Sequence, residues 1–151
     1  MDVMAHILLG VALFGLKKEV IIGSIAPDMG FLPTIRHRHL PYEELRKTRA
    51  FVFGQRFHTI FLWIPLTLLY YLFSEGTSAS LYLMYSIYLH LFMDFITHRH
   101  WGPRFLWPLV DKLFPTGPLQ WENKNVSITI YAIIITLLML RFLVGPYITK
   151  Q

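Results

Sequence analysis

Residues 79–104 contain an apolar segment long enough to cross most of a lipid bilayer, yet it carries two ionisable side chains, His90 and Asp94. Ionisable groups at such a depth cost free energy unless they have a partner or a function. His90 and Asp94 are four residues apart, and on an α-helix this spacing places both side chains on one face. Two ligands on one helix face can reach a single metal ion. The Trp-Gly-Pro sequence at residues 101–103 predicts the end of this helix.

Three long apolar segments predict an all-α integral membrane bundle with about three spanning helices. The clearest is residues 126–148, and the other two, residues 57–73 and 79–97, are separated by a short turn. A hydrophobic content of 54% is high for a soluble domain of this size. Residues 3–16 are too short to span a bilayer alone and predict a short N-terminal helix that completes the bundle. We expect residues 1–151 to form one membrane-embedded domain.

Lys and Arg side chains concentrate in two loops. Of the fourteen, eight lie between Lys17 and Arg56 and four between Arg99 and Lys124. The helical hairpin between these loops returns the chain to its starting side, so both loops face the same side, which the positive-inside rule makes cytoplasmic. The basic residues do not follow one amphipathic face as a groove-binding element requires, so no nucleic acid is expected as a partner.

The first basic loop is expected to contain little regular structure. Pro27 breaks any preceding helix and Asp28 begins a turn. Further along, residues 42–53 predict one short helix. The sequence leaves open whether residues 3–30 cross the membrane or dip into it and return.

Four ionisable residues of the apolar regions are expected at one level of the membrane. His58 starts one helix of the hairpin, and Asp94 and His90 lie one and two turns inside the end of its antiparallel neighbour, so their depths agree to within roughly 10 Å. Asp28 lies in the loop on the same side. Taken singly, His90 and Asp94 could form a structural pair, His58 could be an interfacial histidine and Asp28 a turn residue. Together they have the ligand chemistry of a catalytic zinc or dinuclear metal site.

Five motifs in chain order resemble a known family. They are AHILLG at residues 5–10, GSIAPD at 23–28, RFHT at 56–59, HLFMDFIT at 90–97 and FLWP at 105–108. This order is similar to that of the membrane-bound, LexA-regulated metal-dependent hydrolases of the YdjM type, over roughly residues 4–109. The resemblance implies metal ligands at His6, Asp28, His58, His90 and Asp94. Of these, His58 and Asp94 are the candidate catalytic residues.

The chain departs from that family's pattern in three places. Gly30 stands where a second acid is common, and the family's longer His-Arg-x-x-Thr-His-Ser motif is shortened to residues 55–59. These two changes are consistent with one metal fewer or with a different second metal. The family's Thr-Pro-x-Gly after the last helix is replaced by residues 97–102, which could supply a replacement ligand from His98 or His100.

A more distant likeness supports phosphoester chemistry. The zinc-dependent phospholipases C and single-strand zinc nucleases also use a His-x-x-x-Asp helix with a further His six residues after the Asp. His90, Asp94 and His100 keep that spacing. The likeness adds His100 to the candidate metal ligands.

These observations predict a membrane-bound metal-dependent hydrolase that acts on a lipid-linked or headgroup phosphoester. One or two divalent ions, with zinc as the first expectation, would activate a water molecule. The absence of cysteine restricts the ligands to His, carboxylate and backbone oxygen. Arg36, Arg38 and Arg56 are candidates for binding the phosphate, because a guanidinium matches phosphate oxygens. The expected partners are membrane lipids and the substrate.

Two other functions remain open. A non-catalytic membrane protein could bind or transport a metal ion or a proton through the same residues, although the chain lacks the internal repeat that transporters usually show. A structural membrane subunit is the third alternative. It predicts that the five candidate ligands do not meet at all.

Overall fold

The computed structural model of the chain describes residues 1–98, 102–111 and 117–148. The described residues form helices and turns, with no strand among them beyond one isolated bridge between His98 and Gln120. The all-α prediction is therefore confirmed. In chain order the helices are α1 (Val3–Phe14), α2 (Lys18–Ile25), the 3₁₀-helix η1 (Ala26–His37), α3 (Tyr42–Leu45), α4 (Arg49–Phe57), α5 (Ile60–Phe73), α6 (Ser78–Thr97) and α7 (Lys124–Ile148).

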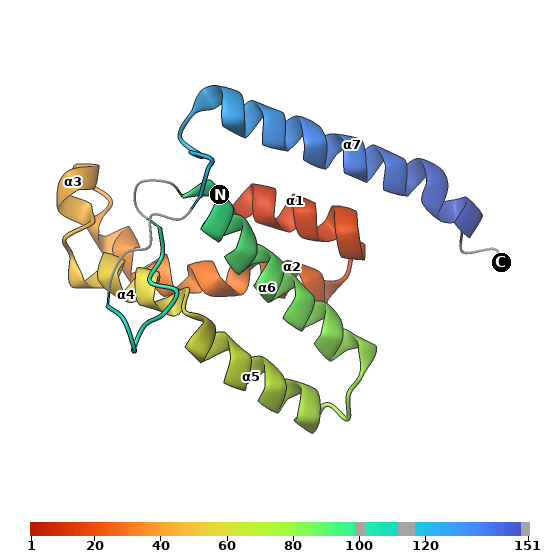
Figure 1. Cartoon of the computed structure of the whole chain (residues 1–151), viewed down its shortest axis with the longest axis horizontal. Helices are drawn as coiled ribbons and strands as arrows, with labels where there is room; N and C mark the ends of the chain where they lie inside the picture. The colour runs from red at the N-terminus through yellow and green to blue at the C-terminus, as the bar shows by residue number, and fades with distance from the viewer. Residues whose placement is uncertain (99–101, 112–116, 149–151) are drawn as a thin grey trace.

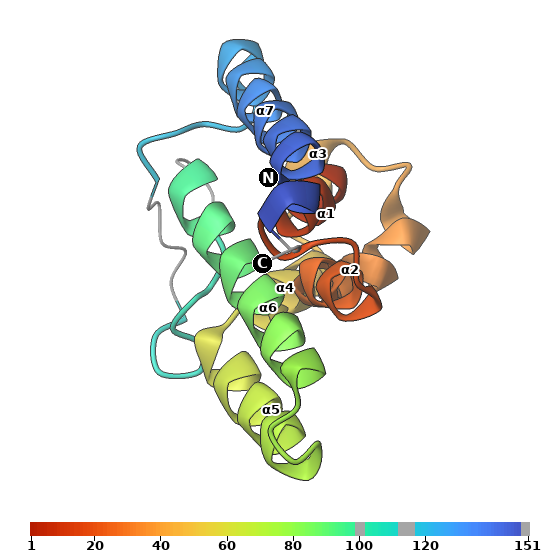
Figure 2. The ribbon, with the colours of Figure 1, turned by 90° about the vertical axis from the view of Figure 1, so that its right-hand side faces the viewer.

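The long helices run back and forth between two ends of the molecule. Helices α5 and α6 form the predicted antiparallel hairpin, α2 packs against α6, and α1 lies between α2 and α7 (Figures 1 and 2). The N-terminus, α3, α4 and the end of α6 gather at one end, whereas the α5–α6 turn lies at the other. Arg141 on α7 ties α7 to α1, because its guanidinium donates to the carbonyl of Leu13 at 3.1 Å.

By length and composition, two helices within the described part of the chain can cross a membrane. These are α6 and α7, and the pair α4 and α5 passes the same test as one span that bends by 53°. The count of two or three agrees with the predicted number of about three. Helix α1 is apolar but shorter, as expected from residues 3–16.

The basic loop is more ordered than the sequence indicated. The predicted helix over residues 42–53 is wrong as a single element, because the chain forms α3, turns, and starts α4 at Thr48, whose side chain accepts a hydrogen bond from the backbone of Phe51. Pro27 does end the α-helical geometry of α2, but the chain continues directly as η1. Pro27 fits there because the first turn of a helix needs no N–H from that residue.

Gly23 sets the close approach of α2 and α6. A Cβ at this position would lie 2.6 Å from the carbonyl oxygen of Leu83 and 2.8 Å from the Cβ of Ser86. Both atoms belong to the body of α6 and cannot rotate away, so any larger residue must push the two helices apart.

Gly23→Ala is therefore expected to destabilise the protein by about 1–3 kcal/mol through overpacking. Thermal unfolding in mild detergent measures the change. Ile22→Ala on the same helix is the matched control, because Ile22 is 55% exposed and should tolerate truncation. Equal unfolding temperatures for Gly23→Ala and the wild type would show that α2 and α6 are not packed as closely as described.

Candidate metal centre

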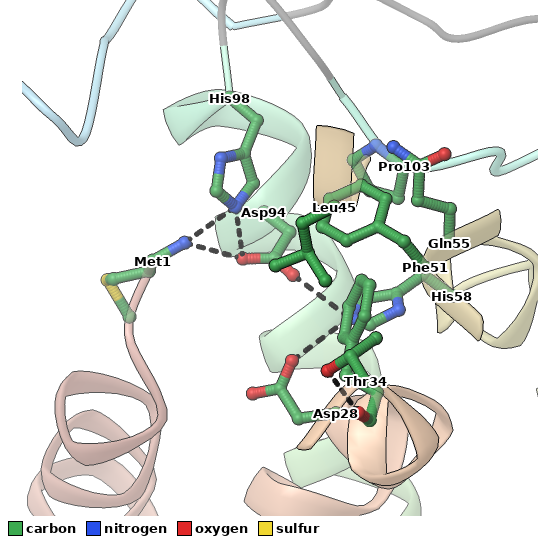
Figure 3. A pocket seen from close by; sticks show the side chains of 11 residues that line it. Met1, Asp28, Thr34, Leu45, Phe51, Gln55, His58, Asp94, His98 and Pro103 are labelled. Carbon is green, nitrogen blue, oxygen red and sulfur yellow. Dashed lines mark hydrogen bonds and ion pairs between the residues drawn. The ribbon is translucent and has the colours of Figure 1, made fainter. Parts of the chain in front are cut away.

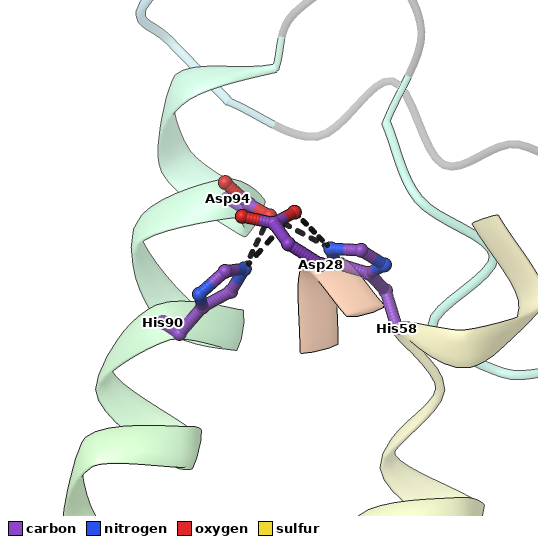
Figure 4. Close-up of side chains that lie close together, drawn as sticks. All are labelled: Asp28, His58, His90 and Asp94. Atoms are coloured by element: carbon purple, nitrogen blue, oxygen red, sulfur yellow. Dashed lines mark ion pairs between the residues drawn. The ribbon is translucent and has the colours of Figure 1, made fainter. Parts of the chain in front are cut away.

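Four side chains from three parts of the fold converge at the end of the bundle where η1 and α4 gather. Asp28 lies in the first turn of η1, His58 lies in the break between α4 and α5, and His90 and Asp94 lie one turn apart on α6. One potential ligand atom from each residue lies within 4.8 Å of the others (Figure 4). The four-residue spacing thus places His90 and Asp94 on one face of α6, as the sequence predicted.

Backbone carbonyls fix the orientation of both imidazoles. Nδ1 of His90 lies 2.7 Å from the carbonyl oxygen of Ser24 on α2, and Nδ1 of His58 lies 2.9 Å from the carbonyl oxygen of Gly54 on α4. A carbonyl oxygen can only accept, so each Nδ1 carries the proton and donates. In the neutral imidazole, Nε2 then holds a lone pair, and in both residues Nε2 points into the centre.

Carboxylate oxygens face these two nitrogens. Nε2 of His90 lies 3.2 Å from Oδ2 of Asp94 and 3.8 Å from Oδ1 of Asp28. Nε2 of His58 lies 3.4 Å and 3.3 Å from the same two oxygens. His58, His90 and Asp94 are buried, whereas the Asp28 side chain keeps 18% of its surface exposed. Two imidazole Nε2 atoms and two carboxylates therefore meet in a largely buried centre.

Such an arrangement fits a bound cation. Two carboxylates this close need positive charge beside them, which either a bound metal ion or protons on the facing imidazoles can supply. Nε2 of His90 and Oδ2 of Asp28 are buried, and neither makes a hydrogen bond within the described part of the chain. Imidazole nitrogen with carboxylate oxygen is a donor set that suits zinc, manganese or iron.

The second oxygen of Asp94 faces a separate group. Oδ1 lies 3.0 Å from Nε2 of His6 on α1 and 3.2 Å from Nε2 of His98, which follows α6. The amino group of Met1 lies 2.7 Å from the same oxygen. The imidazole of His6 stacks on that of His90 with ring centres 3.6 Å apart. Asp94 thus uses Oδ2 toward one histidine pair and Oδ1 toward another, with the Met1 amino group on the Oδ1 side.

The charge states of two flanking residues suit a ligand role. Burial lowers the pKa of His6 to about 4, and the charge of Asp94 opposes this only in part, so the ring is neutral at pH 7. Burial acts to raise the pKa of Asp28, but the hydrogen bond from His58 and the charge of His90 outweigh it and hold the pKa below its ordinary value. Asp28 is therefore a carboxylate at neutral pH.

Of the five residues that the resemblance implied as ligands, the structure gathers Asp28, His58, His90 and Asp94 into one group, and it places His6, together with His98, at the other oxygen of Asp94. The sequence leaves the ligand role of His98 open, although His98 follows Asp94 by the same four residues that separate His90 from Asp94. That spacing was the available signal. His100 lies outside the described residues. The ligand role of each residue stays a prediction.

The three candidate phosphate-binding arginines lie away from this cluster. Arg36 and Arg38 are exposed at the end of η1. Arg56 forms an ion pair with Asp111 at 2.8 Å and lies over the ring of Trp107. The hydrogen bond from Arg56, together with Arg104, holds the pKa of Asp111 below its ordinary value. A role of Arg36, Arg38 and Arg56 in phosphate binding remains a prediction.

A pocket of about 240 Å³ opens onto the centre (Figure 3). Four polar residues of the cluster, Asp28, His58, Asp94 and His98, contribute to its lining. The rest of the wall is mostly apolar and consists of Met1, Phe31, Thr34, Leu45, Phe51, Gln55 and Pro103. As far as the described residues define the wall, it includes none of the three candidate arginines.

Comparison with known proteins finds no matching family model, no matching curated protein and no matching solved structure. The resemblance to the YdjM-type hydrolases and the likeness to zinc-dependent phospholipases C therefore stay predictions from sequence motifs. The geometry of the cluster itself is therefore the basis for a function.

Proposed function

We propose that the chain is a membrane-bound, metal-dependent hydrolase that acts on a phosphoester. The observation that carries the proposal is the inward orientation of His58 and His90. Carbonyl oxygens of Gly54 and Ser24 hold the two Nδ1–H groups, so both Nε2 atoms face the buried carboxylate of Asp94 and the partly exposed carboxylate of Asp28. A divalent cation bound there would supply Lewis-acid polarisation of a phosphoryl oxygen and activation of water.

Each residue has a defined part in this proposal. His58, His90, Asp28 and the Oδ2 atom of Asp94 would hold the first ion. With the amino group of Met1 displaced, His6, His98 and the Oδ1 atom of Asp94 would hold a second ion. Asp94 belongs to both groups of ligands, because its two carboxylate oxygens face different histidines.

The pocket supports an enzyme over a purely structural cluster. Asp28 and His58 line it directly, so a substrate could reach the ions without rearrangement of the bundle. Hydrolysis of a phosphoester needs such access, whereas a structural pair of buried polar groups does not. The basic loops at this end of the molecule would place the site on the cytoplasmic side.

Elemental analysis of the protein purified in mild detergent tests the metal requirement. We expect near-stoichiometric zinc, manganese or iron in the wild type, and loss of it in the double variant His90→Ala, Asp94→Ala. The metal-loaded wild type should release nitrophenol from a nitrophenyl phosphodiester, and a chelator should stop the reaction. Glu75→Gln, at the opposite end of the bundle, is the control for loss of a carboxylate.

The outcomes separate the alternatives. A wild type that binds no metal even after reconstitution excludes the hydrolase and leaves a structural cluster. Stoichiometric metal with no hydrolysis of phosphomonoesters or phosphodiesters favours a protein that binds or transports the ion.

A further inference from the structure

The helix η1 presents three different lines of side chains. A 3₁₀-helix has three residues per turn, so residues three apart lie one above another. Asp28, Phe31 and Thr34 form a pocket line, because all three line the pocket at the metal centre. On a second line, Pro27 and Gly30 are buried, whereas the next member, Pro33, is exposed.

The remaining line is apolar and faces outward. Met29, Leu32 and Ile35 are 52%, 55% and 58% exposed, respectively. We call these three residues the outer line. Isolated exposed apolar residues are ordinary, but three stacked on one face of one helix form a continuous stripe. Phe53 on the neighbouring helix α4 is also 51% exposed.

Basic residues come after the outer line in the sequence. Arg36 and Arg38, both exposed, come directly after Ile35. Residues 36–49 contain five Lys or Arg and two Glu, so this part of the surface has a positive excess. An apolar face bordered by Lys and Arg is typical of helices that lie in the surface of an anionic bilayer.

The place of η1 in the fold agrees with this chemistry. It continues α2, which packs on the candidate span α6, and it lies at the end of the bundle where α6 finishes and α5 begins. If α5 and α6 cross a bilayer, η1 lies at the level where they leave it. The outer line would otherwise face water.

We propose that η1 lies in the headgroup layer of an anionic leaflet, with the outer line inserted at the acyl boundary and Arg36 and Arg38 at lipid phosphates. This docking does not depend on the metal centre. The pocket line is on an adjacent face of the same helix, so the pocket opens within the headgroup layer. Ligands then enter from the lipid surface and not from bulk water.

Site-directed spin labelling tests the proposal directly, because the chain has no cysteine. Single variants Met29→Cys, Leu32→Cys and Ile35→Cys carry a nitroxide in nanodiscs that contain phosphatidylglycerol. We expect the ratio of collisions with oxygen to collisions with a water-soluble nickel complex to exceed that of Glu44→Cys several-fold. Ile133→Cys on α7, which is 54% exposed, is the lipid-facing reference.

Two results overturn the docking. Outer-line labels as accessible to nickel as the label at Glu44 would place η1 in water. Labels shielded from both oxygen and nickel would show that another protein surface covers the stripe.

A second measurement tests the anionic leaflet. Discs of phosphatidylcholine alone should reduce the oxygen-to-nickel ratio at Leu32→Cys, because Arg36 and Arg38 lose their phosphatidylglycerol partners. An unchanged ratio overturns the requirement for anionic lipid. Because the labels report position and not hydrolysis, these results are independent of the metal and activity assays.

Discussion

Asp94→Asn is expected to abolish metal binding at both groups of histidines at once. Asparagine keeps the size and shape of the side chain, but it removes the negative charge and replaces one oxygen by an NH₂ donor. Oδ1 lies next to His6 and His98, and Oδ2 next to His58 and His90. Since both oxygens face imidazole nitrogens, neither orientation of the amide restores both groups.

The loss of affinity should exceed the ~10–100-fold that removal of an outer-shell partner costs. Competition with a chromophoric chelator measures the affinity, and elemental analysis gives the stoichiometry. Hydrolysis should fall to background. Glu75→Gln makes the same chemical change on the exposed α5–α6 turn and should retain the metal. Full metal content in Asp94→Asn would show that this carboxylate is not a ligand.

Single histidine variants are expected to remove one ion each. His90→Ala deletes a nitrogen that faces Oδ2 of Asp94, whereas His6→Ala deletes one that faces Oδ1. If two ions share Asp94, each variant should lose about half of the bound metal. The half-loaded proteins should hydrolyse a nitrophenyl phosphodiester far more slowly than the wild type, because two-metal catalysis stabilises the attacking and leaving oxygens together.

Stoichiometry distinguishes this centre from one with a single ion. With only one ion, His90→Ala should lose it entirely, and His6→Ala should retain it with weaker affinity. His39→Ala replaces an exposed histidine of the basic loop and should leave the metal content unchanged. Equal, complete loss of metal in both His6→Ala and His90→Ala would contradict two separately held ions.

Local sequence patterns predicted much of the fold. Helix periodicity depends on side chains within a few residues, so apolar runs located α1, α5, α6 and α7. The short turn between α5 and α6 predicted that these two helices are antiparallel. The helical repeat also predicted that His90 and Asp94 lie on one face of α6. Shorter elements were less predictable. The division into α3 and α4 depends on capping by Thr48, and the 3₁₀ geometry of η1 depends on its packing against α4.

The candidate site was also predictable from the sequence only in part. Residue types and spacing indicated which His and Asp side chains could hold a metal, and the depth of the hairpin indicated that they would share one level. The contact between His90 and Ser24 joins residues 66 positions apart, and the contact between His6 and Asp94 joins residues 88 positions apart. Neither can be read from a local pattern.

The sequence by itself therefore determined the helical class, the apolar segments and the set of ionisable side chains within them. Only the tertiary structure decided how those side chains are oriented: which nitrogen of each histidine points inward, which oxygen of Asp94 faces which histidines, and which face of η1 meets the pocket. The reason is physical. Hydrophobic periodicity acts along a single helix, whereas the hydrogen bonds that fix a tautomer and the charges that fix a carboxylate come from other helices, and only packing brings them within 3–4 Å.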